Sequence, residues 1–400
     1  MLSDFYPPVV GGMERHVESL SRKLIDRGHD VRVCTSWQDR LPRSEVVHGV
    51  KVTRIEGFFQ KVRYLYGDPA RRYPPPTYDR LTARKLESLI REHKPELIHV
   101  HGWILYSALP LRQKLKIPIV VTLHDYGLVC PKRTFLLTDR NVCKRPFTIQ
   151  CVKCAREDYG FAKSLATSVL VKRNRKNLRN IDKYFAVSSF VKEVHCKYLN
   201  LQNEDVAIIP NFCDDYREPD SGLERLPNDF ILFVGSLNPS KGVDTLLDAY
   251  SKLKTNIPLV LIGARDRNHS YRQPKNVIVH ENASDSLVAE GYRKCRFVII
   301  PSIFPDPCPT VALETMSKGK AVIASAIGGL TDIVKDGETG ILVRGNESTQ
   351  LTNAISYLLN NTNACAIMGE NGNKRFRALF SADVVVPQIE KQYETIATLR

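Results

Sequence analysis

Residues 297–329 read FVIIPSIFPDPCPTVALETMSKGKAVIASAIGG, and this stretch indicates the fold. A short apolar run is followed by a proline-rich loop, a helical pattern from Thr310 to Lys318, a second apolar run and a glycine pair. That order predicts a strand, loop, helix and strand. Because residues 297–300 are wholly apolar, they suit a parallel strand covered on both faces. The loop after them therefore leaves the carboxyl end of a buried strand, where open α/β sheets bind their ligands.

Two carboxylates, Asp306 and Glu314, lie in this loop and in the helix after it. A ligand at the start of that helix would meet free backbone N–H groups at Thr310 and Val311, which favour phosphate oxygens. Asp306 and Glu314 would accept hydrogen bonds from the ligand's hydroxyl groups. The plain alternative is that Asp306 is a solvated loop charge and Glu314 a surface residue of the helix.

Length and composition set the bounds for the whole chain. Four hundred residues predict two domains, and 43% apolar with 25% charged residues is ordinary for a globular protein. A formal net charge of +15 favours anionic partners such as phosphates, lipid head groups or nucleic acid. No apolar run reaches the length of a membrane span, and the start lacks the regions of a signal peptide. We therefore expect a cytoplasmic protein.

Apolar runs alternate with helical patterns along the chain, which predicts doubly wound α/β domains. We expect a first domain over residues 1–200, a second over residues 201–382, and a final helix over residues 383–400 that packs back on the first domain. Only Met1 and Leu2 precede the loop SDFYPP. The first strand of this domain is thus expected to be shortened, or the start of the chain to be truncated or misassigned.

A cysteine-rich loop is predicted over residues 130–154. Its cysteines follow the spacing C-x12-C-x7-C-x2-C, which is typical of a structural zinc site. Four unrelated cysteines are the alternative, and a redox C-x-x-C is disfavoured because no helix start is predicted there. The four predicted zinc ligands are Cys130, Cys143, Cys151 and Cys154.

Two basic segments offer a further kind of partner. Residues 58–76 mix aromatic with basic side chains, and residues 172–179 read KRNRKNLR. Each is compatible with a solvated surface or with peripheral contact to an anionic membrane at its inner face.

The motifs of both halves resemble one family. The pattern P-S-x3-D-x7-E followed by a strand and GG resembles the donor half of retaining GT-B enzymes of the glycosyltransferase family 4 type. The opening SDFYPP with GG-x-E and RGH-x-V resembles the acceptor half of that family. This resemblance spans nearly the whole chain and implies an α/β protein of GT-B fold, with two Rossmann-like doubly wound domains that face a central cleft.

The resemblance also implies roles for individual residues. Asp306 would contact hydroxyls of the transferred sugar, Glu314 the nucleotide ribose, and Lys241 the diphosphate. His124, in the strand-end pair His-Asp, would contact the donor sugar and help to stabilise the transition state. His124, Asp306 and Lys241 are therefore the predicted catalytic residues. The predicted donor-binding residues are Gly11, Gly12, Lys241, Arg265, Thr310, Val311, Glu314, Gly328 and Gly329.

Two positions depart from the family pattern. Asp306 stands where the family usually has glutamate, and Ser236 stands where it has an arginine that binds the diphosphate. Arg265 follows the next apolar run, and its loop position makes it the candidate for the missing cation.

The function implied is transfer of a sugar, with retention, from a UDP- or GDP-sugar to a glycan or lipid-linked acceptor in cell-surface polysaccharide or glycolipid synthesis. The resemblance implies no catalytic metal, so a zinc ion on the cysteines would be structural. The alternatives are a GT-B nucleotide-sugar epimerase, an inactive nucleotide-binding homologue and a zinc-stapled nucleic-acid-binding protein. A nucleic-acid partner is disfavoured because it would leave Asp306, Glu314 and the glycine pairs without a role.

Overall fold

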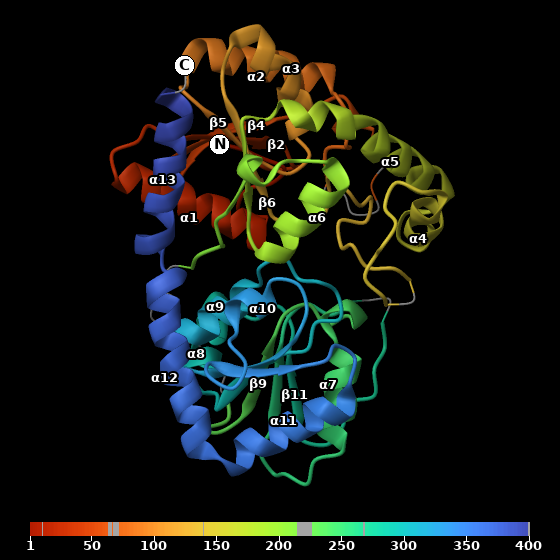
Figure 1. Ribbon diagram of the computed structural model, residues 1–400, viewed down its shortest axis with the longest axis vertical. Coiled ribbons are helices and arrows are strands. Elements are labelled where there is room, and N and C mark those ends of the chain that lie inside the picture. The colour runs from red at the N-terminus through yellow and green to blue at the C-terminus, as the bar shows by residue number, and fades with distance from the viewer. Residues whose placement is uncertain are drawn as a thin grey trace. The chain divides into compact units, whose positions relative to one another are not determined.

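The computed structural model describes residues 1–9, 11–62, 66, 72–138, 140–213, 226–266 and 269–398. The chain divides into two compact units. The first comprises residues 1–138, 142–211 and 385–400, and the second comprises residues 139–141 and 212–384. Each unit is a Rossmann-like α/β layer structure built around one mainly parallel sheet (Figure 1).

The sheet of the first unit has the strand order β3-β4-β2-β1-β5-β6-β7-β8. Only Leu2 and Ser3 form the central strand β1, but Leu2 pairs with both Cys34 and Val100. β3 pairs antiparallel with β4, and the other described pairs are parallel. The strands are β1 (Leu2–Ser3), β2 (Arg32–Ser36), β3 (Ser44–Val47), β4 (Val50–Ile55), β5 (Ile98–His101), β6 (Ile119–Leu123), β7 (Lys183–Ala186) and β8 (Val206–Ile208).

Helices pack against this sheet, and α1 shows the amphipathic pattern that this requires. α1 buries Val17, Leu20 and Leu24, which recur at helical spacing on one face. α2 begins where the Asp79 carboxylate accepts hydrogen bonds from two backbone N–H groups of the first turn, 2.9 and 3.0 Å away. The helices are α1 (Gly12–Asp26), α2 (Arg80–His93), α3 (Leu105–Leu115), α4 (Ile149–Tyr159), α5 (Phe161–Asn174), α6 (Ser189–Leu199) and most of α13 (Ala382–Thr398), with 3-10 turns at Phe59–Lys61, Arg175–Asn180 and Asn203–Asp205.

The first unit extends beyond the predicted boundary at residue 200. The reason is β8, a three-residue strand at the edge of the first sheet that pairs with β7. α13 also belongs to this unit, and its Tyr393 hydroxyl lies 2.6 Å from His99 Nδ1. No helix within the described ranges combines the length and the apolar character that crossing a bilayer requires.

The second unit has the strand order β11-β10-β9-β12-β13-β14, and its strand pairs are parallel. The strands are β9 (Ile231–Val234), β10 (Leu259–Ile262), β11 (Val277–His280), β12 (Phe297–Ile300), β13 (Ala321–Ser325) and β14 (Gly340–Val343). The helices are α7 (Val243–Ser251), α8 (Asp285–Lys294), α9 (Thr310–Ser317), α10 (Leu330–Ile333), α11 (Ser348–Asn360) and α12 (Thr362–Leu379), with a 3-10 turn at Pro239–Lys241.

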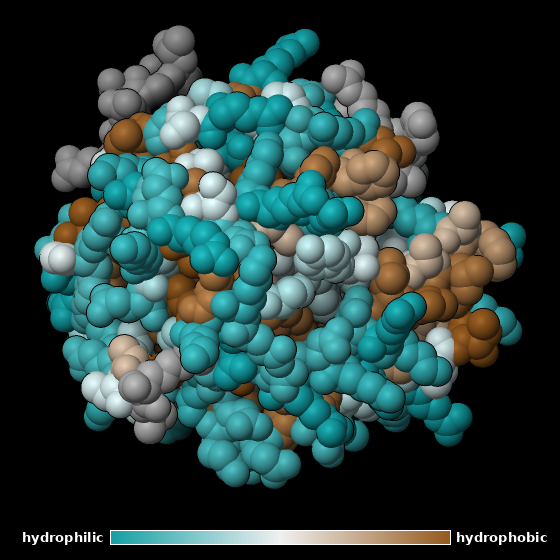
Figure 2. Space-filling view, turned by 90° about the horizontal axis from the view of Figure 1, so that it is seen from above, coloured by the Kyte–Doolittle hydropathy of each residue, from teal (hydrophilic) through white to brown (hydrophobic). Residues whose placement is uncertain are grey.

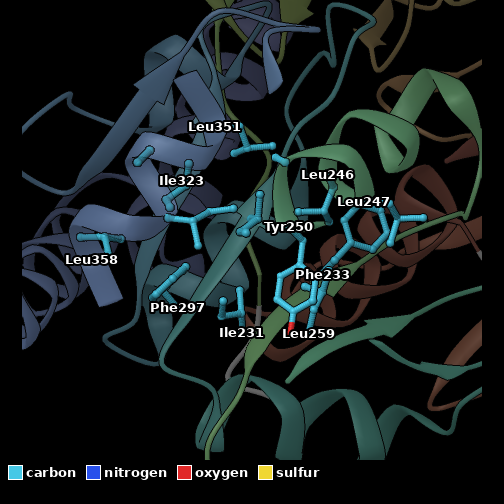
Figure 3. Close-up of a cluster of buried hydrophobic side chains, with 14 of the residues drawn as sticks. Ile231, Phe233, Leu246, Leu247, Tyr250, Leu259, Phe297, Ile323, Leu351 and Leu358 are labelled. Atoms are coloured by element: carbon cyan, nitrogen blue, oxygen red, sulfur yellow. The ribbon is translucent and has the colours of Figure 1, made fainter. Parts of the chain in front are cut away.

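A large apolar cluster holds the second unit together. Figure 3 shows side chains of α7 and α11 packed against strands of the sheet, including Tyr250, Phe297 and Leu351. The stretch that opened the sequence analysis forms β12, α9 and β13, and all four residues of β12 are buried. The parallel, doubly covered strand predicted at residues 297–300 is therefore confirmed, and its carboxyl end carries the candidate site.

Candidate active site

The candidate site lies at the carboxyl edge of the second sheet. From β9 the chain proceeds through β10 to β11 on one side, whereas β12, β13 and β14 follow on the other. The strand order therefore reverses between β9 and β12, and open α/β sheets bind ligands at such a switch point. Residues 235–242 leave β9 there and residues 301–309 leave β12 there, so the two loops meet at one edge.

A lysine–carboxylate pair joins these two loops. Lys241 Nζ donates to Asp306 Oδ2 at 2.6 Å, and the ammonium lies 4.8 Å from the centre of the Phe304 ring. The side chain of Asp306 is 9% exposed and that of Lys241 is 30% exposed. The backbones are also joined, because the N–H groups of Ile303 and Phe304 donate to Ser240 O at 2.9 and 3.3 Å. A phosphate at this point would find a fixed cation beside a fixed carboxylate.

Glycines allow the loops to approach this closely. Gly242 has a φ of 76°, and a Cβ there would lie 1.9 Å from Pro301 O. Gly328 has a φ of 59°, and its Cβ would lie 2.5 Å from Asp306 O. The N–H of Gly329 donates to the same Asp306 O at 2.7 Å. The loop that carries Asp306 is thus held from both sides by backbone contacts that a side chain would break.

Replacing Gly328 by alanine should destabilise the protein by about 2 kcal/mol or more, because the new Cβ adds a clash with Asp306 to the strain of a positive φ. Gly337→Ala is the matched control, since Gly337 has a φ of 73° and no atom within 4 Å of the new Cβ. That control should show only the backbone strain, about 1 kcal/mol. Urea unfolding of both variants measures the difference; equal losses would show that the Gly328 contact is not required.

Glu314 is buried rather than exposed on α9. The residue is 5% exposed, and the Tyr292 hydroxyl of α8 donates to Glu314 Oε2 at 2.7 Å. Asp306 is likewise only 6% exposed. The alternative, in which both carboxylates are solvated surface charges, is therefore wrong. A buried carboxylate needs compensating partners, and Tyr292 and Lys241 supply them.

The helix start beside them is open to a ligand. α9 has no side-chain cap, and Thr310 and Val311 are half-buried. Within the described part of the chain, the N–H groups of these two residues meet no acceptor. Such groups at the start of a helix favour an anion.

The structure does not bring Arg265 together with the Lys241–Asp306 pair. Its Nε lies 2.8 Å from Glu281 Oε1, and its guanidinium stacks over Tyr271 at 5.4 Å. The backbone of Arg265 does pair with Leu237, next to Ser236. Its role as substitute for the family arginine stays a prediction.

In the first unit, His124 follows β6 and belongs to a group of histidines. Its Nε2 lies 2.9 Å from His101 Nδ1, and its ring centre lies 4.9 Å from that of His16. Burial, with the nearby Arg133 charge adding to it, lowers the pKa of His124 to about 3. Burial also lowers the pKa values of His16 and His101 well below the usual range. At neutral pH these rings are uncharged and act as hydrogen-bonding groups.

Gly11 and Gly12 stand at the start of α1, as the sequence predicts. A Cβ on Gly11 would lie 2.2 Å from Glu14 Oε2, whereas Gly12 faces open space. Gly11 thus leaves room for the buried Glu14 carboxylate beside the helix start. Whether the two glycines face a donor phosphate stays a prediction.

Sequence reasoning missed three side chains next to predicted site residues. Tyr292 donates a hydrogen bond to Glu314, and His16 lies beside His124. The charge of Arg133 acts on His124, and Arg133 itself pairs with Asp125 at 2.6 Å and with Asp4 at 3.4 Å. The opposing effects of burial and of these carboxylates leave the pKa of Arg133 raised. Each of the three arrives from a different element, and no spacing in the sequence marks that convergence.

The structural zinc ion proposed for the four cysteines stays a prediction. Among the described residues, no group of three or more His, Cys, Asp or Glu side chains is arranged to hold a metal ion. None of the four cysteines forms a disulfide bond, and Cys130 and Cys151 are buried. Cys151 and Cys154 belong to α4, which begins at Ile149, so the expectation that no helix start frames this pair was wrong. The loop also contains backbone contacts such as the 2.9 Å hydrogen bond from Cys143 N to Phe135 O.

The second unit also contains a hollow of about 750 Å³ at the amino ends of its strands. Its lining includes Arg296 and Lys320, which immediately precede β12 and β13. The hollow is therefore remote from the carboxyl ends where Lys241 and Asp306 meet. The switch-point geometry and the chemistry of those two residues decide the placement of the site.

Comparisons with known proteins agree with this geometry. The model of glycosyltransferase family 4 matches residues 10–217, and that of glycosyl transferases group 1 matches residues 216–375. An uncharacterised glycosyltransferase of Methanocaldococcus jannaschii is 28% identical over 99% of this chain and 98% of its own length.

Solved structures show the same fold. Sucrose-phosphate synthase from Thermosynechococcus elongatus matches with a TM-score of 0.76 at 21% identity, over 98% of this chain and 95% of that one. An Anabaena protein in complex with UDP-glucose matches with a TM-score of 0.68 at 18% identity, over 98% and 99% of the two chains. The epimerase, inactive-homologue and nucleic-acid alternatives find no support in these comparisons. The chain has the GT-B fold and belongs to glycosyltransferase family 4.

Proposed function

We propose that this glycosyltransferase moves a sugar, with retention at the anomeric carbon, from a UDP- or GDP-sugar to a glycan or lipid-linked acceptor. The observation that carries the proposal is the Lys241–Asp306 pair at the switch point of the second sheet. Lys241 supplies a cation for a diphosphate, and Asp306 supplies a carboxylate for sugar hydroxyls. The two groups are joined by a hydrogen bond, so they lie side by side.

The donor would be held mainly by the second unit. Its diphosphate would take the ammonium of Lys241 and the N–H groups of Thr310 and Val311, which stabilise negative charge as the leaving group forms. Asp306, released from Lys241, would accept hydrogen bonds from the sugar. Glu314, oriented by Tyr292, would accept from the ribose hydroxyls. Gly328 and Gly329 fix the Asp306 loop in support of these contacts.

The first unit is assigned the roles that the family resemblance implies. His124 would hydrogen-bond the donor sugar as a neutral imidazole, which its lowered pKa supports. Gly11 and Gly12 would contact the donor phosphates. For retention the family resemblance implies front-face attack, in which the leaving phosphate helps to deprotonate the acceptor hydroxyl.

A thermal-shift series with UDP, GDP, ADP and their sugars tests the donor. A ligand at 100 times its dissociation constant should stabilise the protein by about 2.7 kcal/mol, so a raised Tm with one nucleotide series is expected. Uridine, guanosine and adenosine are the controls, because they lack the diphosphate that Lys241 would bind. No shift with any of the nucleotides or activated sugars would contradict the proposal.

The stereochemistry is measured separately. With an α-linked donor, nuclear magnetic resonance of the earliest product should show an α-linked sugar. A β-linked product would contradict retention while leaving nucleotide binding unaffected.

A further inference from the structure

Helix α5 turns apolar side chains outward. Phe161, Leu165 and Val169 are 59%, 40% and 52% exposed, and they recur every four residues along one face. Ile149, at the start of the neighbouring α4, is 72% exposed. Figure 2 shows hydrophobic surface gathered at the right-hand edge, where Figure 1 places α4 and α5.

The pattern is the inverse of that of an ordinary surface helix. The inward face of α5 buries Ser164, Thr167 and Ser168 together with Val171, so its small polar residues lie inside and its large apolar residues lie outside. A helix whose only partner is its own protein normally does the opposite. A contiguous exposed apolar face of this kind indicates a surface that meets another apolar phase.

The charges around this face are of one sign. Residues 161–180, which form α5 and the 3-10 turn after it, contain six Lys and Arg and no Asp or Glu. Lys172 and Arg173 follow Val169 on the outward face; both are exposed and neither forms an ion pair with any residue that the structure describes. These residues belong to the basic segment 172–179 singled out in the sequence. The other basic candidate, residues 58–76, lies partly outside the described residues.

We propose that the outward face of α5, with Phe161, Leu165, Val169, Lys172 and Arg173, docks on the surface of an anionic lipid bilayer. The apolar side chains would enter the boundary between head groups and acyl chains, and the cations would remain among the anionic head groups. A bilayer is favoured over a folded protein partner because one helix combines an apolar stripe with uncompensated positive charge, which complements an anionic interface. This surface is independent of the donor site.

Vesicle co-sedimentation tests the proposal, using phosphatidylcholine vesicles with and without phosphatidylglycerol. The wild-type chain should bind only the vesicles that contain phosphatidylglycerol, and high salt should weaken binding. Replacing Phe161, Leu165 and Val169 together by serine should reduce binding by about tenfold or more. Because these side chains are exposed, the Tm of the triple variant and its thermal shift with nucleotide should be unchanged, which separates this test from that of the donor site.

The matched control replaces three exposed apolar residues of the second unit, Tyr357, Ile367 and Leu379, by serine. This control should bind vesicles as the wild type does. Undiminished binding by the α5 triple variant would overturn the proposal. The proposal would also be overturned if the wild-type chain did not bind the vesicles but formed a dimer, and the triple variant were a monomer.

A spectroscopic readout completes the test. Phe161→Trp should retain binding, and its fluorescence should shift to the blue with phosphatidylglycerol vesicles but not with phosphatidylcholine alone. A tryptophan at residue 161 that stays in a water-like environment on bound vesicles would overturn the placement of α5 in the interface.

Discussion

Replacing Lys241 by alanine should lower kcat/KM by about 100-fold or more. The ammonium of Lys241 is proposed to meet the diphosphate of the donor, and loss of one charge-assisted contact to a phosphate weakens binding by about 2 to 3 kcal/mol. The loss in rate should exceed the loss in donor affinity, because charge on the leaving diphosphate grows in the transition state. Steady-state kinetics together with nucleotide affinity separate these two effects.

Lys252→Ala is the matched control for this variant. Lys252 belongs to the same unit, but its ammonium pairs with Asp248 on the surface, 2.6 Å away, with both side chains about half exposed. It should retain full activity. Because Lys241→Ala also deprives the buried Asp306 of its cation, Tm is measured for both variants. Wild-type turnover in a folded Lys241→Ala protein would remove Lys241 from the site.

Much of the second unit follows from sequence because its decisive signals are local. The apolar run at residues 297–300 and the helix from Thr310 both appear as predicted. Gly328 was predicted as a donor contact, and the structure adds a physical reason for glycine there, the backbone of the Asp306 loop. Strand order then brings Lys241 and Asp306 into contact, although they are far apart in the chain.

Local sequence patterns do not predict the contacts between elements that are far apart in the chain. Nothing in the sequence of α8 marks Tyr292 as the partner of Glu314, because an apolar residue at helical spacing predicts only a place in the core. The boundary near residue 200 missed β8 because three residues are too few to show strand periodicity.

The cysteine loop shows the limit of spacing arguments. The spacing of four cysteines predicts a zinc site, but it does not give the arrangement of the thiols in space on which binding of an ion depends. In the structure, α4 places Cys151 and Cys154 on a helix, and the loop before it is ordered by its own backbone hydrogen bonds. The inverted polarity of α5 is likewise invisible without burial, because its sequence alone does not say which face is outside.

Glu314→Gln should weaken nucleotide affinity by about 10-fold to 100-fold, because a carboxylate accepts hydrogen bonds from a ribose diol more strongly than an amide does. Gln keeps an oxygen for the Tyr292 hydroxyl, so Tm should change little. Glu338→Gln is the control, since the Glu338 carboxylate is exposed and forms an ion pair with Lys335 at the surface.

The ribose assignment itself is tested by a double-mutant cycle with UDP or GDP, whichever binds, and its 2′,3′-dideoxy form. The wild type should prefer the natural nucleotide, because removing the hydroxyls leaves the buried Glu314 carboxylate with fewer donors. In Glu314→Gln that preference should shrink to nearly nothing, whereas in Glu338→Gln it should persist. If the variant discriminates between the two nucleotides as strongly as the wild type does, Glu314 does not contact the ribose, and the buried Tyr292–Glu314 pair is structural.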